Sequence, residues 1–119
     1  MTRADLISAL NEAADASSSA REVMTGVERA LRTGALQLTQ GRDIQETLCT
    51  SRIEELRTEL QAAMDRVART RHEFRMALAS QCADSGMSTR EIGELWGFSR
   101  QRAQALIQET REARRAAQG

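Results

Sequence analysis

The sequence contains no proline, no tyrosine and no lysine, and only two phenylalanines and one tryptophan among its 119 residues. With so few bulky aromatic side chains, the core has to be built from Leu, Ile, Val, Met and Ala. The β-branched and aromatic runs typical of strands are absent, whereas the abundant Ala, Arg, Glu, Gln and Leu all suit helices. The sequence therefore predicts an all-α protein.

Residue patterns typical of catalytic or metal sites are also absent. Cys49 and Cys82 lie far apart in the sequence, and His72 is the only histidine, so neither a metal nor a redox motif can be assembled from close neighbours. No nucleophile–base arrangement, paired-carboxylate site or phosphate-cradling glycine loop is visible. We expect a non-enzyme without metal or cofactor. No apolar run approaches membrane length, so we also expect a soluble, cytoplasmic protein that makes no membrane contact.

The charges cancel overall but are distributed unevenly along the chain. All seventeen basic residues are arginines, against seventeen acidic residues. Residues 1–60 hold seven arginines and ten acidic residues, whereas residues 61–119 hold ten arginines and seven acidic residues. This asymmetry favours a nucleic-acid contact near the C-terminal end.

The N-terminal third predicts two helices separated by a serine run. Apolar residues at helical spacing predict a helix over 3–16, and Ser17–Ser19 are expected to interrupt it and cap a second helix over 20–38. The apolar face of that second helix is expected to consist of Met24, Val27, Leu31 and Leu38. Gly26 and Gly34 either weaken this helix or allow a neighbouring helix to approach closely.

A long helical segment is predicted over residues 43–85. Asp43 and Glu46 have the spacing of a capping box at its start, and Ser51 with Glu54 repeats that spacing, which leaves open a break near Thr50. Apolar residues then follow a heptad pattern at Ile53, Leu56, Leu60, Ala63, Val67, Phe74 and Ala77, with Thr70 at a weak position. Such a stripe needs a partner, either the N-terminal helices in cis or a second copy in a coiled-coil dimer.

Residues 88–108 predict a helix, a tight turn and a second helix. Ser88 and Glu91 form a capping box, and Met87 and Ile92 have the spacing of a hydrophobic staple. Gly97 is suited to a positive φ at the turn, and Ser99 is suited to cap the next helix. We expect a three-helix core formed by Phe74, Leu78, Cys82, Ile92, Leu95, Trp96, Phe98, Ala103, Leu106 and Ile107, with Gly93 at a close crossing and Gly86 ending the preceding helix.

Arginine and glutamine line the exposed side of the second helix of this pair. In helix-turn-helix docking the N-terminal residues of that helix enter the major groove, where Arg pairs with guanine and Gln with adenine. We expect base reading by Ser99, Arg100, Gln101 and Gln104. Phosphate contacts are expected from Arg90, Arg102, Arg111, Arg114 and Arg115, the last three lying free on a fraying C-terminal extension.

The stretch STREIGELWGFSRQRAQAL resembles the helix-turn-helix of the fourth conserved region of bacterial sigma factors and related small bacterial regulators. Shared features are the capped first helix, the small residue at Gly93, the turn glycine at Gly97 and the Ser-Arg-rich start of the second helix. The resemblance covers about residues 67–108 and implies DNA binding. Residues 1–60 resemble no family, and the chain has no evident place for polymerase-binding and promoter-melting regions.

These observations combine into one hypothesis about organisation and function. Residues 1–66 form a helical oligomerisation region, residues 67–108 the helix-turn-helix domain, and residues 109–119 a basic extension. The chain is expected to be a bacterial transcription regulator or chromosome-binding protein of the nucleoid that binds double-stranded DNA as a homodimer. The alternative is a protein-interaction module, either an RNA polymerase accessory factor or an antitoxin-like partner.

Overall fold

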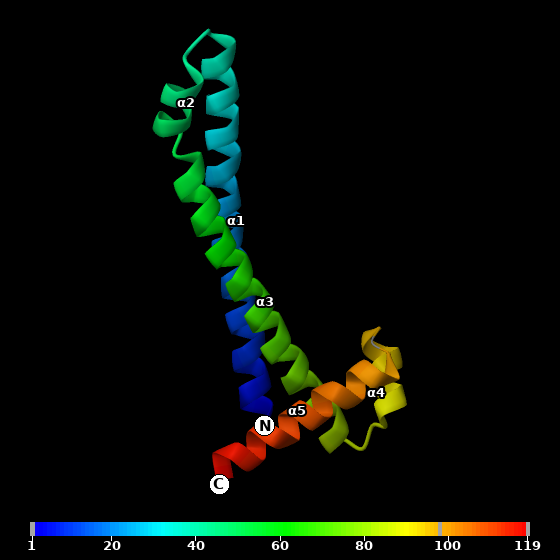
Figure 1. Cartoon of the computed structure of the whole chain (residues 1–119). Coiled ribbons are helices and arrows are strands. Elements are labelled where there is room, and N and C mark those ends of the chain that lie inside the picture. Colours follow the sequence, from blue (N-terminus) through cyan, green and yellow to red (C-terminus); the bar gives the residue numbers. More distant parts are fainter. Residues whose placement is uncertain (1, 98, 119) are drawn as a thin grey trace. The chain divides into compact units, whose positions relative to one another are not determined.

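The computed structural model describes residues 2–97 and 99–118, with only the backbone of Arg100 included. Every regular element in these residues is a helix: α1 (Arg3–Thr39), α2 (Ile44–Thr50), α3 (Ile53–Asp84), α4 (Thr89–Trp96) and α5 (Arg100–Gln118) (Figure 1). The all-α prediction is confirmed. Two compact units are formed, the hairpin unit of residues Ala14–Ala68 and the C-terminal unit of Met1–Ala13 with Arg69–Gly119.

In the hairpin unit, the heptad stripe of α3 packs against α1 of the same chain. Arg66 Nη1 donates a hydrogen bond to Ser19 Oγ at 3.4 Å, and a Cβ built on Gly34 would lie 3.5 Å from Ile53 Cδ1. These two contacts show that the helices run antiparallel, as the ribbon also shows (Figure 1). Of the two partners expected for the stripe, the N-terminal segment in cis is the one observed.

The expected break at Ser17–Ser19 is wrong, because α1 continues through it as one helix. Ala16 and Ala20 on either side of the serines are only 1% and 7% exposed, so the buried face carries on without interruption. Serine costs less than about 0.7 kcal/mol per helical residue relative to alanine, which such packing offsets.

The buried face of α1 also differs from the expected one. Met24, Leu31 and Leu38 are 49%, 52% and 46% exposed, and the residues buried against α3 are instead small ones: Ala16, Ala20, Ala30 and Gly34. Small side chains let the two helix backbones approach closely, and the larger residues of α3 fill the space between them. The apolar residues of α1 that stand out in the sequence are therefore left on the surface.

The helix is interrupted at Ser51 and Arg52, which separate α2 from α3. This agrees with the alternative of two helices. Asp43 caps α2 as expected, with its Oδ2 accepting a hydrogen bond from the backbone N–H of Glu46 at 3.1 Å. Arg52 between the helices has φ of 58°. The capping box expected at Ser51 is wrong, since its buried hydroxyl has no hydrogen-bond partner among the described residues.

The glycines of α1 are not required for the close packing of the hairpin unit. A Cβ at Gly26 would meet its nearest neighbour, Leu56 Cδ2, at 3.7 Å, which is ordinary van der Waals contact. Gly26→Ala is therefore expected to raise the free energy of unfolding by about 0.5–1 kcal/mol, measured by urea denaturation. Gly86→Ala is the matched control and is expected to lower it, since Gly86 has φ of +90°. If Gly26→Ala instead lowered the free energy of unfolding, the two helices would be closer together than described.

The C-terminal unit begins where α3 ends in a glycine turn. Gly86 adopts φ of 90°, its N–H bonds to Ala83 O at 3.0 Å, and the Met87 N–H bonds to Cys82 O at 3.1 Å. This pair of bonds is the Schellman arrangement, and it satisfies carbonyls that the helix end leaves open. The prediction that Gly86 ends this helix is confirmed.

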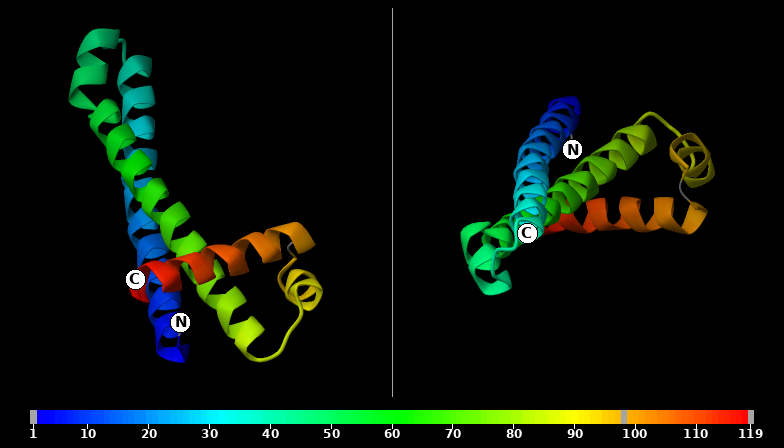
Figure 2. Two further views of the ribbon diagram at one scale, coloured as in Figure 1. Left: turned by 60° about the horizontal axis from the view of Figure 1, so that its bottom comes forward. Right: turned by 90° about the horizontal axis from the view of Figure 1, so that it is seen from above.

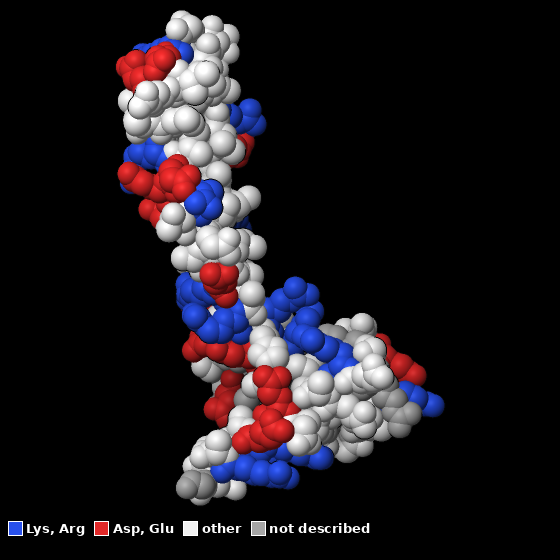
Figure 3. Space-filling model, viewed as in Figure 1, with Lys and Arg blue, Asp and Glu red and all other residues white. Residues whose placement is uncertain are grey.

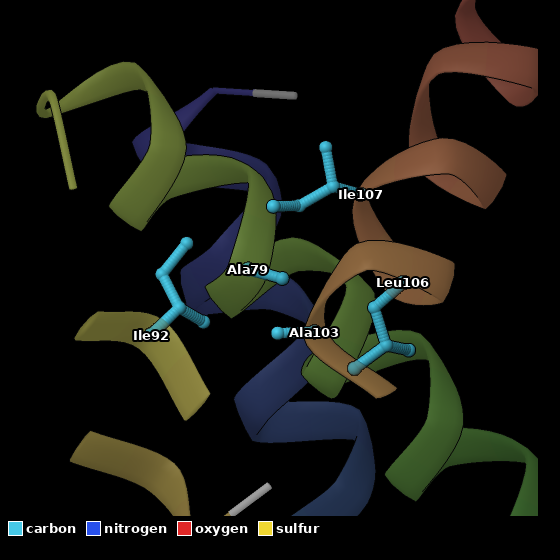
Figure 4. Close-up of a cluster of buried hydrophobic side chains, with 5 residues drawn as sticks. All are labelled: Ala79, Ile92, Ala103, Leu106 and Ile107. Carbon is cyan, nitrogen blue, oxygen red and sulfur yellow. The ribbon is translucent and has the colours of Figure 1, made fainter. Parts of the chain in front are cut away.

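The core of this unit is small and lies where α3, α4 and α5 meet (Figures 2 and 4). Ala79 from α3, Ile92 from α4 and Leu106 from α5 are each at most 1% exposed. Ala103 and Ile107 complete the cluster, and Met76, Cys82, Ala83 and Met87 pack around it. The staple formed by Met87 and Ile92 is thus present.

Four expected core residues do not take part as predicted. Phe74 and Leu78 are only partly buried and lie outside the cluster, because α3 packs here with the face that carries Met76 and Ala79. Leu95 and Trp96 are 61% and 41% exposed, because α4 is only eight residues long and buries just Ile92 and Gly93. The prediction for Phe98 lies outside the described residues.

The expectation that residues 109–119 fray is wrong, since α5 continues to Gln118. Thr110 is 3% exposed, and its hydroxyl donates to Leu106 O at 2.8 Å and also lies 3.5 Å from Met76 O on α3. Polar contacts of this kind hold the second half of α5 against α3 although it lacks an apolar face.

Candidate nucleic-acid interface

A side-chain cap stabilises the first turn of α5. The Ser99 hydroxyl accepts a hydrogen bond from the Arg102 backbone N–H at 3.0 Å, as expected for an N-cap residue. One capped helix therefore follows another, since Ser88 Oγ accepts from the Glu91 N–H at 3.1 Å and Gly97 ends α4 at φ of 71°. The caps and the turn glycine expected from the sequence are confirmed.

The exposed side of α5 carries the polar residues that the sequence singles out. Ala103, Leu106, Ile107 and Thr110 face the core, and this leaves Gln101, Gln104, Ala105 and Gln108 exposed. Ser99 is exposed as well, but as the cap it already holds the Arg102 N–H. The Arg100 side chain lies outside the described residues, and only its place at the first position of α5 is known.

An open groove of about 560 Å³ runs along one flank of α5. Gln104, Gln108 and Arg111 line it from α5, and Thr89 lines it from the first position of α4. The groove thus places a predicted base-reading residue beside a predicted phosphate-binding residue. Thr89 and Gln108 were not among the predicted site residues, because only the folding of α4 against α5 brings them together.

Arg114 has a structural role that the sequence did not indicate. Its Nη2 lies 3.1 Å from Ser80 Oγ and 3.3 Å from Asp84 Oδ2, both on α3. The expectation that this residue lies free is therefore wrong. Arg111 and Arg115 are exposed, and Arg90 on α4 pairs at 3.6 Å with Glu94, one helical turn further on.

On the other flank of α5, arginines of α3 approach its first turn. Arg75 is partly buried, and its pKa is lowered first by that burial and then by the positive charges of Arg71 and Arg102. About one turn earlier on α3 and two turns later on α5, His72 Nε2 and Glu109 Oε1 lie 2.8 Å apart across the same pair of helices. Arg71 and Arg75 could not be found from the sequence, because they precede the helix-turn-helix stretch of residues 88–108 and nothing local links them to Arg102.

Comparison with known proteins gives no match to a family model, to a curated protein or to a solved structure. The resemblance to sigma-factor regions therefore rests on the residues of 67–108 alone. Among the described residues, no three or more His, Cys, Asp or Glu side chains gather as potential metal ligands. None of the described helices is both long and apolar enough to span a membrane.

Proposed function

We propose that this chain is a sequence-specific double-stranded DNA-binding protein, a transcription regulator or chromosome-binding protein, that reads the major groove with residues 100–108 of α5. The observation that carries the proposal is the capped first turn of α5, which stands on a packed three-helix core with Gln101, Arg102 and Gln104 exposed. Side chains at this end of the second helix reach base edges when a helix-turn-helix docks.

The chemistry of these residues fits the edges of bases and the phosphates beside them. A glutamine amide can pair with adenine N6 and N7, and an arginine guanidinium with guanine O6 and N7. Gln101 and Gln104 supply the amides, and Arg100 supplies the guanidinium at the first helical position. Arg111 and Arg115 are exposed further along α5, where they can contact phosphates and set the position of the helix without reading sequence.

A dimer would present two copies of α5, and the hairpin unit offers a surface for it. Because the α3 stripe is already covered by α1, support for a dimer now comes from the apolar stripe of Met24, Leu31 and Leu38 on α1. These residues recur every seven positions and are about half exposed. A facing helix of a second copy, with the same spacing, could bury them.

Selection from randomised duplexes tests this function together with the dimer. The wild-type chain is expected to enrich one recurring half-site in pairs, with centres about 34–36 Å apart or at a multiple of that distance. Leu31→Glu places a charge in the apolar stripe and is expected to give a monomer by light scattering and to select single half-sites. Leu36→Glu is the matched control, because Leu36 is 58% exposed on a different face of α1.

Two results would count against this account. If the selection enriched no sequence, the proposal of sequence-specific binding would be contradicted. If the Leu31→Glu variant still had the mass of a dimer, the apolar stripe could not be the dimer interface.

A second candidate function, a protein-interaction module, is favoured by the exposed Leu95 and Trp96 at the end of α4. Such a module would dock a polymerase subunit or another regulator on this apolar pair. Trp96 is the only tryptophan of the chain, so its fluorescence reports directly on this surface. A blue shift on adding purified RNA polymerase, without any binding to duplex DNA, would favour this candidate.

A further inference from the structure

The short helix α2 buries polar side chains and exposes apolar ones. Thr47 and Ser51 are 1% and 8% exposed, and neither hydroxyl has a hydrogen-bond partner among the described residues. Ile44 and Leu48 are 66% and 55% exposed, and uncharged surface covers much of the end of the hairpin unit that contains them (Figure 3). A buried hydroxyl without a partner destabilises a packed state, because its bonds to water are lost. The side chains of α2 therefore do not favour the position in which it is packed.

The junction between α2 and α3 is strained as well. Arg52 adopts φ of 58° and is the one residue other than glycine with a positive φ in the part of the chain that the structure describes. A residue with a Cβ is disfavoured in this left-handed region. The ladder of α3 begins with the Leu56 N–H, which donates to Arg52 O at 3.1 Å, so the N–H groups of residues 53–55 precede the first ladder bond. If α2 and α3 formed one continuous helix, the strain would be relieved and these N–H groups would gain helical partners.

A continuous helix would also exchange the residues that face α1. The heptad pattern of α3 extends back from Leu56 to Cys49, seven residues earlier, and Cys49 is now exposed. At about 100° per residue, the two buried hydroxyls would turn to the side away from α1, where water can bind them. Glu46, seven residues before Ile53, would bring a carboxylate toward α1. Because burial of a charge is unfavourable, Glu46 opposes the continuous helix and accounts for the break.

We propose that residues 51 and 52 form a two-state hinge, at which the hairpin unit converts between the kinked form described above and a straight form with one helix from residue 44 through α3. The strain at Arg52 and the buried hydroxyls favour the straight form, and Glu46 favours the kinked form. Ile44 and Leu48 turn with α2, so the two forms present different surfaces, and a partner that binds one surface shifts the hinge. This inference concerns the hairpin unit and does not depend on DNA binding.

The test uses two substitutions that favour opposite forms of the full-length chain. Glu46→Leu replaces the carboxylate with an apolar side chain at the heptad position and favours the straight form. Arg52→Gly relieves the strain at the positive φ and is unfavourable within a helix, so it favours the kinked form by about tenfold or more. Amide hydrogen exchange of residues 53–55 is followed by NMR, because these N–H groups gain helical bonds in the straight form.

In the wild type, the amides of residues 53–55 are expected to exchange rapidly. Glu46→Leu should slow their exchange by about tenfold or more, since it buries a leucine in the straight form, and should also slow the alkylation of Cys49 by iodoacetamide. The double variant Glu46→Leu with Arg52→Gly should return both rates to those of the wild type. Glu46→Gln removes only the charge and should slow the exchange by a smaller factor, and it replaces the leucine variant if that variant fails to fold.

A second pair of variants tests the buried hydroxyls. Thr47→Val removes a hydroxyl that has no partner and keeps the shape of the side chain, so it should favour the kinked form and partly reverse the effect of Glu46→Leu. Thr50→Val is the matched control, because the Thr50 hydroxyl donates to Glu46 O at 3.0 Å and lies 3.3 Å from Gln37 Oε1 on α1. It should not reverse that effect.

Two outcomes would overturn the hinge. If Glu46→Leu, or Glu46→Gln in its place, left the amides of residues 53–55 exchanging as rapidly as in the wild type, no straight form would exist. If the exchange were slowed but stayed slow after Arg52→Gly was added, the new side chain at position 46 would protect these amides locally, without any change at Arg52.

Discussion

Replacing Ile92 by alanine is expected to lower the free energy of unfolding of the C-terminal unit by about 2–5 kcal/mol, measured by urea denaturation followed by circular dichroism. Ile92 is 0% exposed and is the main side chain by which α4 contacts Ala79 and Leu106. Its truncation leaves a cavity in a core of few residues, which neighbouring alanines cannot fill.

Leu95→Ala is the matched control on the same helix. It removes a side chain of similar size three residues later, but Leu95 is 61% exposed, so the expected loss is within about 0.5 kcal/mol. Equal losses for Ile92→Ala and Leu95→Ala would mean that α4 buries both residues, as the sequence pattern suggested, and would contradict the packing described above.

The second large effect is expected at the first turn of α5. Arg100→Ala should cost about 1–3 kcal/mol in binding to the preferred duplex and should relax the preference at one base pair, because a bidentate contact to guanine is lost. Arg102→Ala, two residues further, should weaken binding to all duplexes by one common factor, because Arg102 is expected to contact a phosphate and not a base.

Competition titrations with duplexes that differ at single positions measure both variants. If Arg100→Ala lowered the affinity of every duplex equally, Arg100 would be a phosphate contact and base reading would fall to Gln101 and Gln104. If Arg102→Ala changed the base preference, the division of roles between the two arginines would be reversed.

The features that could be predicted from the sequence are those that depend on a few adjacent residues. The caps at Asp43, Ser88 and Ser99 and the positive-φ turns at Gly86 and Gly97 all lie where the sequence indicates. Each involves bonds between residues at most five positions apart. Local chemistry therefore suffices to find them and to place the polar residues of α5 on its exposed side.

The features that could not be predicted depend on which helix faces meet. Hydrophobicity singles out Met24 and Leu31 on α1, yet the close approach of α3 selects the small residues on the neighbouring face. Trp96 is exposed for a related reason, since it is the last residue of α4, which packs through its middle. The sequence does not indicate which face of a helix packs against its neighbour, because both faces are apolar.

The same limit applies to the candidate interface. Judged from the sequence alone, Arg114 is expected to be a free phosphate contact. Its ion pair with Asp84 depends on how α5 packs against α3. Arg71 and Arg75 join the candidate site only through the same crossing. Long-range contacts thus pair one predicted residue with a carboxylate, although its side chain stays exposed, and bring two other arginines near the candidate interface.

The most direct test of the central claim is the binding of the wild-type chain to a 30-base-pair duplex at 50 and 200 mM salt, followed by fluorescence anisotropy. If a dimer neutralises about six phosphates, the affinity should fall by about a thousandfold between the two concentrations. Absence of binding at 50 mM salt, or equal affinity at both concentrations, would contradict the proposal that this protein binds the DNA backbone and reads it with α5.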